Sequence, residues 1–179
     1  MPARSALRSA RPGRYTWPGR PRRRGRGGEP ALEDSERTNV MEAKVTLERA
    51  MHFKATLGSG YSLEMDTAPE HGGTGPGARP MELVLAGLAG CTAFDVVSIL
   101  RKSRQEVTGL DVEARAERAP QDPRVFTRIW LEYVVRGRKL SEDAVKRAIE
   151  LSESKYCSVA AMLRSTARID TSYRIENEE

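Results

Sequence analysis

The chain has 179 residues, a length that suits one domain and is short for two. Its formal net charge of +5 and its pI of about 9.5 first suggest a nucleic-acid partner. The charge is unevenly distributed, however: residues 1–40 contain ten arginines and four acids, and residues 41–179 are nearly neutral. The basic character therefore belongs to one segment and says little about the rest of the protein.

The basic segment predicts no folded core. Residues 1–28 contain nine arginines, four prolines, five glycines and no acid, so they cannot bury enough apolar surface to offset the entropy of the chain. We expect residues 1–40 to be a disordered extension and residues 41–179 to form one domain. The extension could be an upstream addition to a protein that starts at Met41, an address signal, or an arm that binds nucleic acid.

No membrane segment and no metal site are expected. The longest uncharged apolar run, residues 83–94, is too short to cross a bilayer about 30 Å thick, and the N-terminus lacks the apolar stretch of a secretory signal. A cytoplasmic protein is the simplest interpretation. The two cysteines are too few for a disulfide scaffold or a four-cysteine zinc site, and neither they nor the two histidines show metal-ligand spacing.

Alternating apolar residues predict a β-meander at the start of the domain. The alternation covers residues 43–47, 51–57 and 61–65, with a Gly-Ser-Gly turn at residues 58–60. Residues 67–79 are rich in glycine and predict a loop, but their glycines do not match a phosphate-binding motif.

Pro80 then begins a helix that extends to about residue 101, because proline suits the first helical turn. Apolar side chains cover nearly every side of this helix, which is typical of a buried one. Arg101, Lys102 and Arg104 suit its C-terminal end.

A hairpin, a second helical region and a last strand complete the domain. Ser141 is a good N-cap for the second helical region, and Ser152-Glu153-Ser154 can interrupt it so that another helix begins near Tyr156. Because strands and helices are segregated along the chain, the fold class is α+β. The expected ranges are 107–119 and 125–135 for the hairpin, 140–165 for the helices and 167–175 for the closing strand.

The two cysteines are the candidates for chemistry. Cys91 lies in the most apolar helix, where a single cysteine is usually an inert core residue. Cys157 lies near an expected helix start and follows Lys155, and both features lower the pKa of a thiol. If the two helices meet, one thiolate could attack a peroxide and become a sulfenic acid, and the other cysteine could close a disulfide. The residues alone leave both inert thiols and a redox pair open.

Two motifs resemble the signatures of the OsmC/Ohr superfamily, the osmotically inducible and organic hydroperoxide resistance proteins. They are PMELVLAGLAGCTAFDVVSILR at residues 80–101 and SESKYCSVAAML at residues 152–163. The resemblance extends over about residues 42–176. The positions that match the family are Pro80, Leu83, Gly87, Cys91 and Cys157.

The resemblance implies an intertwined homodimer in which two sheets wrap around the two central helices, with active sites at the dimer interface. It implies a thiol peroxidase of the oxidative stress response that reduces organic hydroperoxides, with hydrogen peroxide as a further substrate. Cys91 would be the peroxidatic residue, and a disulfide to Cys157 would follow. A dithiol such as a lipoylated protein would be the reductant, and no metal or organic cofactor is implied.

The sequence departs from the family at the activating charges. Family peroxidases place a glutamate directly after the helix-opening proline, and here that position is Met81. Glu82 is one residue later and is turned by about 100° around the helix. The partner arginine comes from an N-terminal strand in the family, and the candidates here are Arg49 and Lys54.

Two further functions are open alternatives. Met81 favours a non-catalytic dimer that binds a small apolar ligand in a stress response, with the thiols as packing. The arginine-rich residues 1–40 favour nucleic-acid binding. For Asp95, one helical turn after Cys91, we expect a buried, hydrogen-bonding role rather than a catalytic one.

Overall fold

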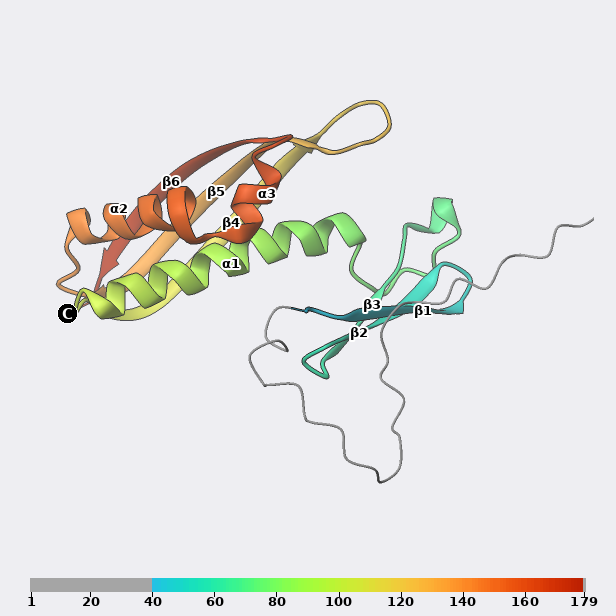
Figure 1. The fold of residues 1–179 in the computed structure, drawn as a ribbon, viewed down its shortest axis with the longest axis horizontal. Coiled ribbons are helices and arrows are strands. Elements are labelled where there is room, and N and C mark those ends of the chain that lie inside the picture. Colours follow the sequence, from blue (N-terminus) through green and yellow to red (C-terminus); the bar gives the residue numbers. More distant parts are fainter. Residues whose placement is uncertain (1–39, 179) are drawn as a thin grey trace, which may run out of the picture. The chain divides into compact units, whose positions relative to one another are not determined.

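The computed structural model describes residues 40–178, which form two three-stranded sheets and a set of helices (Figure 1). The predicted disordered extension, residues 1–40, lies outside the described residues except for Val40. The α+β class and the predicted order of elements are confirmed. The helices and strands are β1 (Ala43–Arg49), β2 (His52–Leu57), β3 (Ser62–Met65), η2 (Pro69–His71), α1 (Pro80–Lys102), β4 (Glu106–Arg118), β5 (Phe126–Arg138), α2 (Glu142–Leu151), η3 (Ser152–Tyr156), α3 (Ser158–Leu163) and β6 (Arg168–Asn177).

The first sheet is the predicted meander, in which β2 pairs antiparallel with β1 and with β3. Asp66, directly after β3, organises the loop that follows. One carboxylate oxygen accepts the N–H of Thr67 at 2.7 Å, and the other accepts the N–H and the hydroxyl of Thr74 at 2.9 and 2.8 Å and the N–H of Gly75 at 3.1 Å. The glycine-rich connection is therefore built around one buried carboxylate.

The helix α1 begins at Pro80, as predicted. The backbone N–H of Arg79 donates to the Glu82 side chain at 2.9 Å, which satisfies one of the free donors at this helix end. Arg101 and Lys102 lie in the last turn, where positive charge is favourable.

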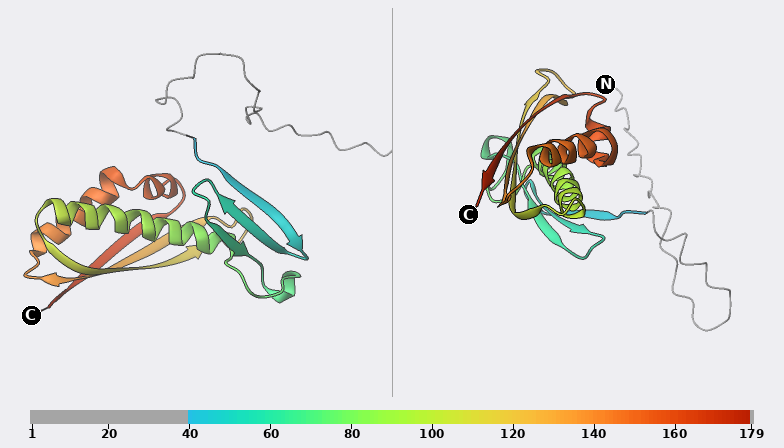
Figure 2. Two further views of the ribbon diagram at one scale, coloured as in Figure 1. Left: turned by 90° about the horizontal axis from the view of Figure 1, so that it is seen from below. Right: turned by 90° about the vertical axis from the view of Figure 1, so that its left-hand side faces the viewer.

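The second sheet has the order β4-β5-β6, with β5 antiparallel to β4 and parallel to β6. A parallel pair needs a long crossover, and α2, η3 and α3 supply it. The helices α1, α2 and α3 all cover one face of this sheet (Figures 1 and 2). Every second residue of β5 points into the resulting core, and these residues are Ile129, Leu131, Tyr133 and Val135, each at most 2% exposed.

The predicted interruption of the second helical region is a π-helical turn, η3, between α2 and α3. The Ser141 hydroxyl accepts the N–H of Ala144 at the start of α2, which confirms the predicted N-cap. After η3, Cys157 takes an extended backbone conformation and caps α3. The turn therefore places a cysteine at a helix start that faces the core.

Among residues 40–178 of one chain, the buried residues of α1 lie on one side of the helix. Its buried residues follow a four-residue spacing, and the aromatic ring of Phe94 on another side is 82% exposed. Length and composition alone would allow α1 to cross a membrane, with a mean hydropathy of 2.1 over 18 residues. Core helices of soluble proteins meet the same criterion, so this is weak evidence. The buried residues of α1 are Leu88, Thr92, Val96 and Leu100.

Candidate active site

The fold brings Cys91 and Cys157 together from distant parts of the chain. Cys91 lies in the middle of α1, and Cys157 lies at the N-cap of α3, which packs against α1. Their sulfur atoms and a carboxylate oxygen of Asp95 all lie within 4.8 Å of one another. Both cysteines are free thiols, and a disulfide between them would require the sulfur atoms to move to about 2.05 Å from one another.

The environment of Cys157 differs from the prediction made from its position at a helix start. The pKa of Cys157 is raised to about 11, chiefly because burial disfavours the thiolate, and Cys91 and Asp95 raise the pKa further. The N–H of Ala160 donates to the sulfur at 3.4 Å and lowers the pKa, but this one donor does not outweigh burial. The ammonium of Lys155 lies over the ring of Tyr156, at 5.3 Å. The predicted lowering of the Cys157 pKa was therefore wrong.

A chain of buried hydroxyl groups lies behind the two thiols. The Tyr133 hydroxyl lies 2.7 Å from the Thr92 hydroxyl, which lies 2.8 Å from the Ser152 hydroxyl, and Ser152 donates to Asp95 at 3.0 Å. Burial raises the pKa of the Tyr133 phenol, so this group keeps its proton. The expected hydrogen-bonding role of Asp95 agrees with this contact, although Asp95 is only half-buried.

The predicted activating charges are not assembled around the thiols within one chain. Arg49 is exposed on β1, Lys54 is half-buried on β2, and Glu82 holds the N–H of Arg79. Among residues 40–178, no lysine or arginine side chain donates a hydrogen bond to either sulfur, and Arg49 has no ion-pair partner. These three residues stay candidates for activating Cys91.

Two groups of side chains have separations that suit a metal ion. The first is the cysteine pair with Asp95. The second lies on the first sheet, where Glu48, His52 and Glu64 offer ligand atoms within 4.8 Å of one another. His52 is 4% exposed; its Nε2 lies 2.8 Å from Glu64, and its Nδ1 lies 3.6 Å from Asp66 without a hydrogen-bond partner. The expectation that the protein uses no metal stays a prediction.

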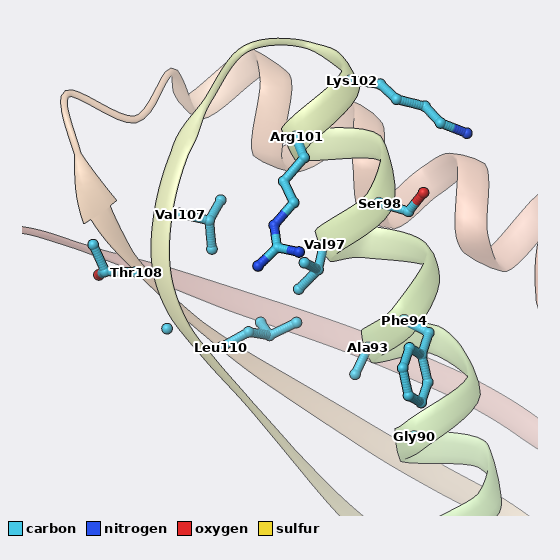
Figure 3. Close-up of a pocket in the computed structure, with 11 residues that line it drawn as sticks. Gly90, Ala93, Phe94, Val97, Ser98, Arg101, Lys102, Val107, Thr108 and Leu110 are labelled. Atoms are coloured by element: carbon cyan, nitrogen blue, oxygen red, sulfur yellow. The ribbon is translucent and has the colours of Figure 1, made fainter.

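A cavity beside α1 does not contain the thiols. It has a volume of about 720 Å³ and lies between the second half of α1 and the start of β4. Figure 3 shows Arg101 reaching into this space, whereas Lys102 points away from it. Most of the other lining side chains are apolar, including Phe94, Val97 and Leu110. This cavity suits an apolar ligand with one negative group, and it is separate from the cysteine pair.

The hydroxyl groups of the site were not among the residues predicted from the sequence. Thr92, Tyr133 and Ser152 come from α1, β5 and η3, and their contacts span up to 60 residues of chain. One signal was available: Tyr133 occupies an inward position of a strand that alternates regularly, and a buried phenol needs a hydrogen-bond partner.

Comparisons with known proteins identify the family. Residues 72–172 match the family described as OsmC-like protein. Protein YhfA of Escherichia coli K12 is 43% identical over 136 residues, which cover 75% of this chain and 98% of YhfA. A hypothetical protein of Aquifex aeolicus is 31% identical, with a TM-score of 0.69 over 78% of this chain and 98% of its own.

A third relative shows the fold at lower identity. The organic hydroperoxide resistance protein OsmC of Legionella pneumophila is 15% identical, with a TM-score of 0.60 over 76% of this chain and 97% of its own. At this identity the likeness concerns the fold alone. Together with the α+β architecture and the match of residues 72–172, these findings show that the chain belongs to the OsmC-like proteins of the OsmC/Ohr superfamily.

Proposed function

We propose that this protein is a thiol peroxidase that reduces organic hydroperoxides, and hydrogen peroxide as a further substrate, with Cys91 and Cys157 as its redox pair. The observation that carries the proposal is the approach of the two free thiols to within 4.8 Å, although 65 residues separate them in the chain. Membership of a superfamily that includes organic hydroperoxide resistance proteins supports the same activity.

The surroundings of the two thiols support one order of events. Cys91 is partly exposed, whereas Cys157 is 3% exposed and has a raised pKa. A peroxide can therefore reach Cys91 more easily, and Cys157 is better suited to react in a second step. This supports Cys91 as the peroxidatic residue and Cys157 as the resolving residue.

The reaction balances without a metal or an organic cofactor. The Cys91 thiolate attacks one peroxide oxygen, the O–O bond breaks, and the alkoxide leaves and takes a proton to become an alcohol. Cys91 becomes a sulfenic acid. The Cys157 thiol then attacks the Cys91 sulfur, a disulfide forms, and water leaves. A dithiol, such as a lipoylated protein, reduces the disulfide and becomes a disulfide itself.

Activation of Cys91 needs a positive charge, because a nearby cation stabilises the thiolate. Arg49 is the first candidate, with Lys54 as the weaker one and Glu82 as the carboxylate that would orient the arginine. Within residues 40–178 of one chain, no lysine or arginine donates a hydrogen bond to either sulfur, so the activating charge would come from a group outside those contacts. A second copy of the protein is one source of such a group.

The proposed homodimer is supported by the uncovered side of α1. Phe94 is 82% exposed and Val84 is 38% exposed, on a helix whose most apolar 18 residues have a mean hydropathy of 2.1. Large exposed apolar groups on one side of a helix are typical of an interface between proteins. A second copy that covers this side would bury α1 as its composition predicts.

The test is a single-turnover experiment on the reduced protein. One equivalent of cumene hydroperoxide is added, and alcohol, free thiols and protein mass are followed over time. We expect one alcohol and one Cys91–Cys157 disulfide for each chain. The variant Cys91→Ser should form no alcohol, and Cys157→Ser should form one alcohol and a sulfenic acid that dimedone traps on Cys91.

The double variant Cys91→Ser, Cys157→Ser is the matched blank, because it measures peroxide loss to methionine and to the buffer. Equal alcohol formation by this blank and the unchanged protein would contradict the proposal. Formation of a disulfide without a preceding sulfenic acid on Cys91 would contradict the assigned order.

The cavity beside α1 supports a second candidate function, the binding of a small apolar ligand. Its volume of about 720 Å³ is in the range of small-molecule sites, and Arg101 would pair with a negative group. Extraction of a lipid-like molecule from the purified protein, with no peroxide consumption above the blank, would favour this function over the first.

A further inference from the structure

The directions of the hydrogen bonds behind the thiols follow from a count of hydrogen atoms. An ionised carboxylate only accepts, so Ser152 must use its single hydroxyl hydrogen for Asp95 at 3.0 Å. The 2.8 Å contact between Ser152 and Thr92 must then use the Thr92 hydrogen, and the 2.7 Å contact between Thr92 and Tyr133 must use the Tyr133 hydrogen. All three buried hydroxyl groups therefore donate toward Asp95.

This chain fixes Asp95 beside the reacting atoms. Ser152 binds one carboxylate oxygen, Oδ2, and the other has no hydrogen-bond partner among the described residues. A carboxylate oxygen of Asp95 lies within 4.8 Å of both sulfur atoms. Asp95 also lines a cavity of about 440 Å³ together with Lys102 and Tyr156. It is therefore held between the thiol pair and a space that small molecules can enter.

Disulfide formation at this pair requires the transfer of one proton. With a pKa of about 11, Cys157 is a neutral thiol near pH 7, and a neutral thiol is a poor nucleophile. The hydroxyl group of the Cys91 sulfenic acid is a poor leaving group unless it receives a proton. The proton that the attacking thiol must lose is the proton that the leaving oxygen must gain.

We propose that the Asp95 carboxylate carries this proton, a role that rests on the proposed peroxidase function and extends it to the resolving step. Asp95 accepts the proton of Cys157 as the Cys157 sulfur forms a bond to the Cys91 sulfur. The S–O bond of the sulfenic acid breaks, and the leaving hydroxide takes the proton from Asp95 and departs as water. The two sulfurs end as a disulfide, Asp95 ends as a carboxylate, and no external oxidant or reductant is needed.

The groups that face Asp95 are compatible with this role. Cys91 and Cys157 face it on one side, Ser152 holds it from η3, and Lys102 and Tyr156 share its cavity. Ser152 can keep its hydrogen bond to Oδ2 while Asp95 is transiently protonated, so the relay does not require the hydroxyl chain to rearrange.

The experiment uses the variant Asp95→Asn and measures sulfenic acid formation and disulfide formation separately. Asparagine keeps an oxygen that accepts from Ser152 but cannot take up a proton. Reduced protein is mixed with one equivalent of cumene hydroperoxide in a quenched-flow instrument, dimedone traps the sulfenic acid, and mass spectrometry counts the disulfide. We expect sulfenic acid formation within about twofold of the unchanged protein and disulfide formation slower by about 100-fold. The matched control is Asp143→Asn, at an exposed aspartate in the first turn of α2.

The dependence on pH separates a proton carrier from a residue that only holds the helices. In Asp95→Asn, Cys157 must ionise before it attacks, so the rate of disulfide formation should rise about tenfold per pH unit between pH 7 and pH 9. In the unchanged protein and in Asp143→Asn, the rate should change little over this range. Equal rates and equal pH dependences in Asp95→Asn and the unchanged protein would overturn the role of Asp95. Absence of both a disulfide in the unchanged protein and a trapped sulfenic acid in Cys157→Ser would instead overturn the peroxidase proposal, and this role with it.

Discussion

The hydroxyl groups of Thr92 and Tyr133 lie 2.7 Å apart in the core and join the central helix α1 to the middle strand β5. Both residues are at most 1% exposed, so water cannot replace this bond. The bond is the first link of the chain that ends on Asp95. The packing of α1 on the second sheet and the geometry of the thiol pair therefore depend on the same contact.

The variant Tyr133→Phe should lose about 1 kcal/mol of unfolding free energy, because it removes one buried hydrogen bond while the ring still fills its space. Urea denaturation measures the loss. Tyr173→Phe is the control, since the Tyr173 hydroxyl makes a long, exposed contact of 3.3 Å with Glu142 and its removal should cost less than about 0.5 kcal/mol. Equal losses of unfolding free energy in the two variants would show that the buried hydrogen bond stabilises the fold no more than the exposed one.

The lowered pKa of Asp66 leads us to expect that the protein loses stability in acid. Burial would raise the pKa of Asp66, but hydrogen bonds from Thr74 and Thr67, together with the nearby His52 ring, outweigh burial and hold the pKa well below its usual range. A carboxyl group with a lowered folded-state pKa stabilises the fold above its unfolded pKa of about 3.9, and this stabilisation is lost as the pH falls toward the folded-state value.

We therefore expect Asp66→Asn to be less stable than the unchanged protein at pH 7, and the difference to shrink below about pH 4. Urea denaturation at a series of pH values measures both. Asp122→Asn, in the exposed turn between β4 and β5, provides the comparison. A difference that stays constant from pH 7 to pH 3 would contradict the account of Asp66.

Much of the fold could be predicted from the sequence because its signals are local. The alternation along β5, the proline at the start of α1 and the Ser141 cap all act within a few residues, and each agrees with the structure. The split of the second helical region was also visible, although its π-helical form was not.

The chemistry of the site could be predicted less well because it depends on contacts between distant elements. The position of Cys157 near Lys155 suggested a lowered pKa, yet burial against Cys91 and Asp95 raises it. Burial is a property of the folded chain, and the spacing of nearby residues in the sequence does not predict it. The family resemblance predicted that the two cysteines lie close together. Their positions in the sequence alone showed only that a redox pair requires the two helices to meet.

The proposed role of Arg49 makes a prediction about the first chemical step. If its guanidinium stabilises the Cys91 thiolate, Arg49→Gln should slow sulfenic acid formation by about tenfold or more and leave the later disulfide formation unchanged. Stopped-flow mixing with cumene hydroperoxide, in a Cys157→Ser background, isolates this step. Lys44→Gln, also exposed on β1, is the matched control and should behave like its parent. Equal rates for the two variants would remove Arg49 from the proposed site.

The exposed side of α1 makes a prediction about assembly. Phe94 is 82% exposed on a largely apolar helix. Burial of a phenylalanine side chain contributes about 1.5–3 kcal/mol to the free energy of association. A dimer that covers this side buries two such rings, so Phe94→Glu should place two unpaired charges in the interface and weaken the dimer by at least about 100-fold. Sedimentation at several protein concentrations measures the change.

Val125→Glu is the matched control for the Phe94 variant, because Val125 is an exposed apolar residue in the turn that precedes β5. Circular dichroism checks that both variants fold. If the arginine that activates Cys91 comes from the second copy, dissociation should also slow sulfenic acid formation, and the rate should then recover at high protein concentration. A Phe94→Glu protein that stays dimeric would place the interface on another surface. A monomer with the full rate would show instead that one chain supplies all the groups that Cys91 needs.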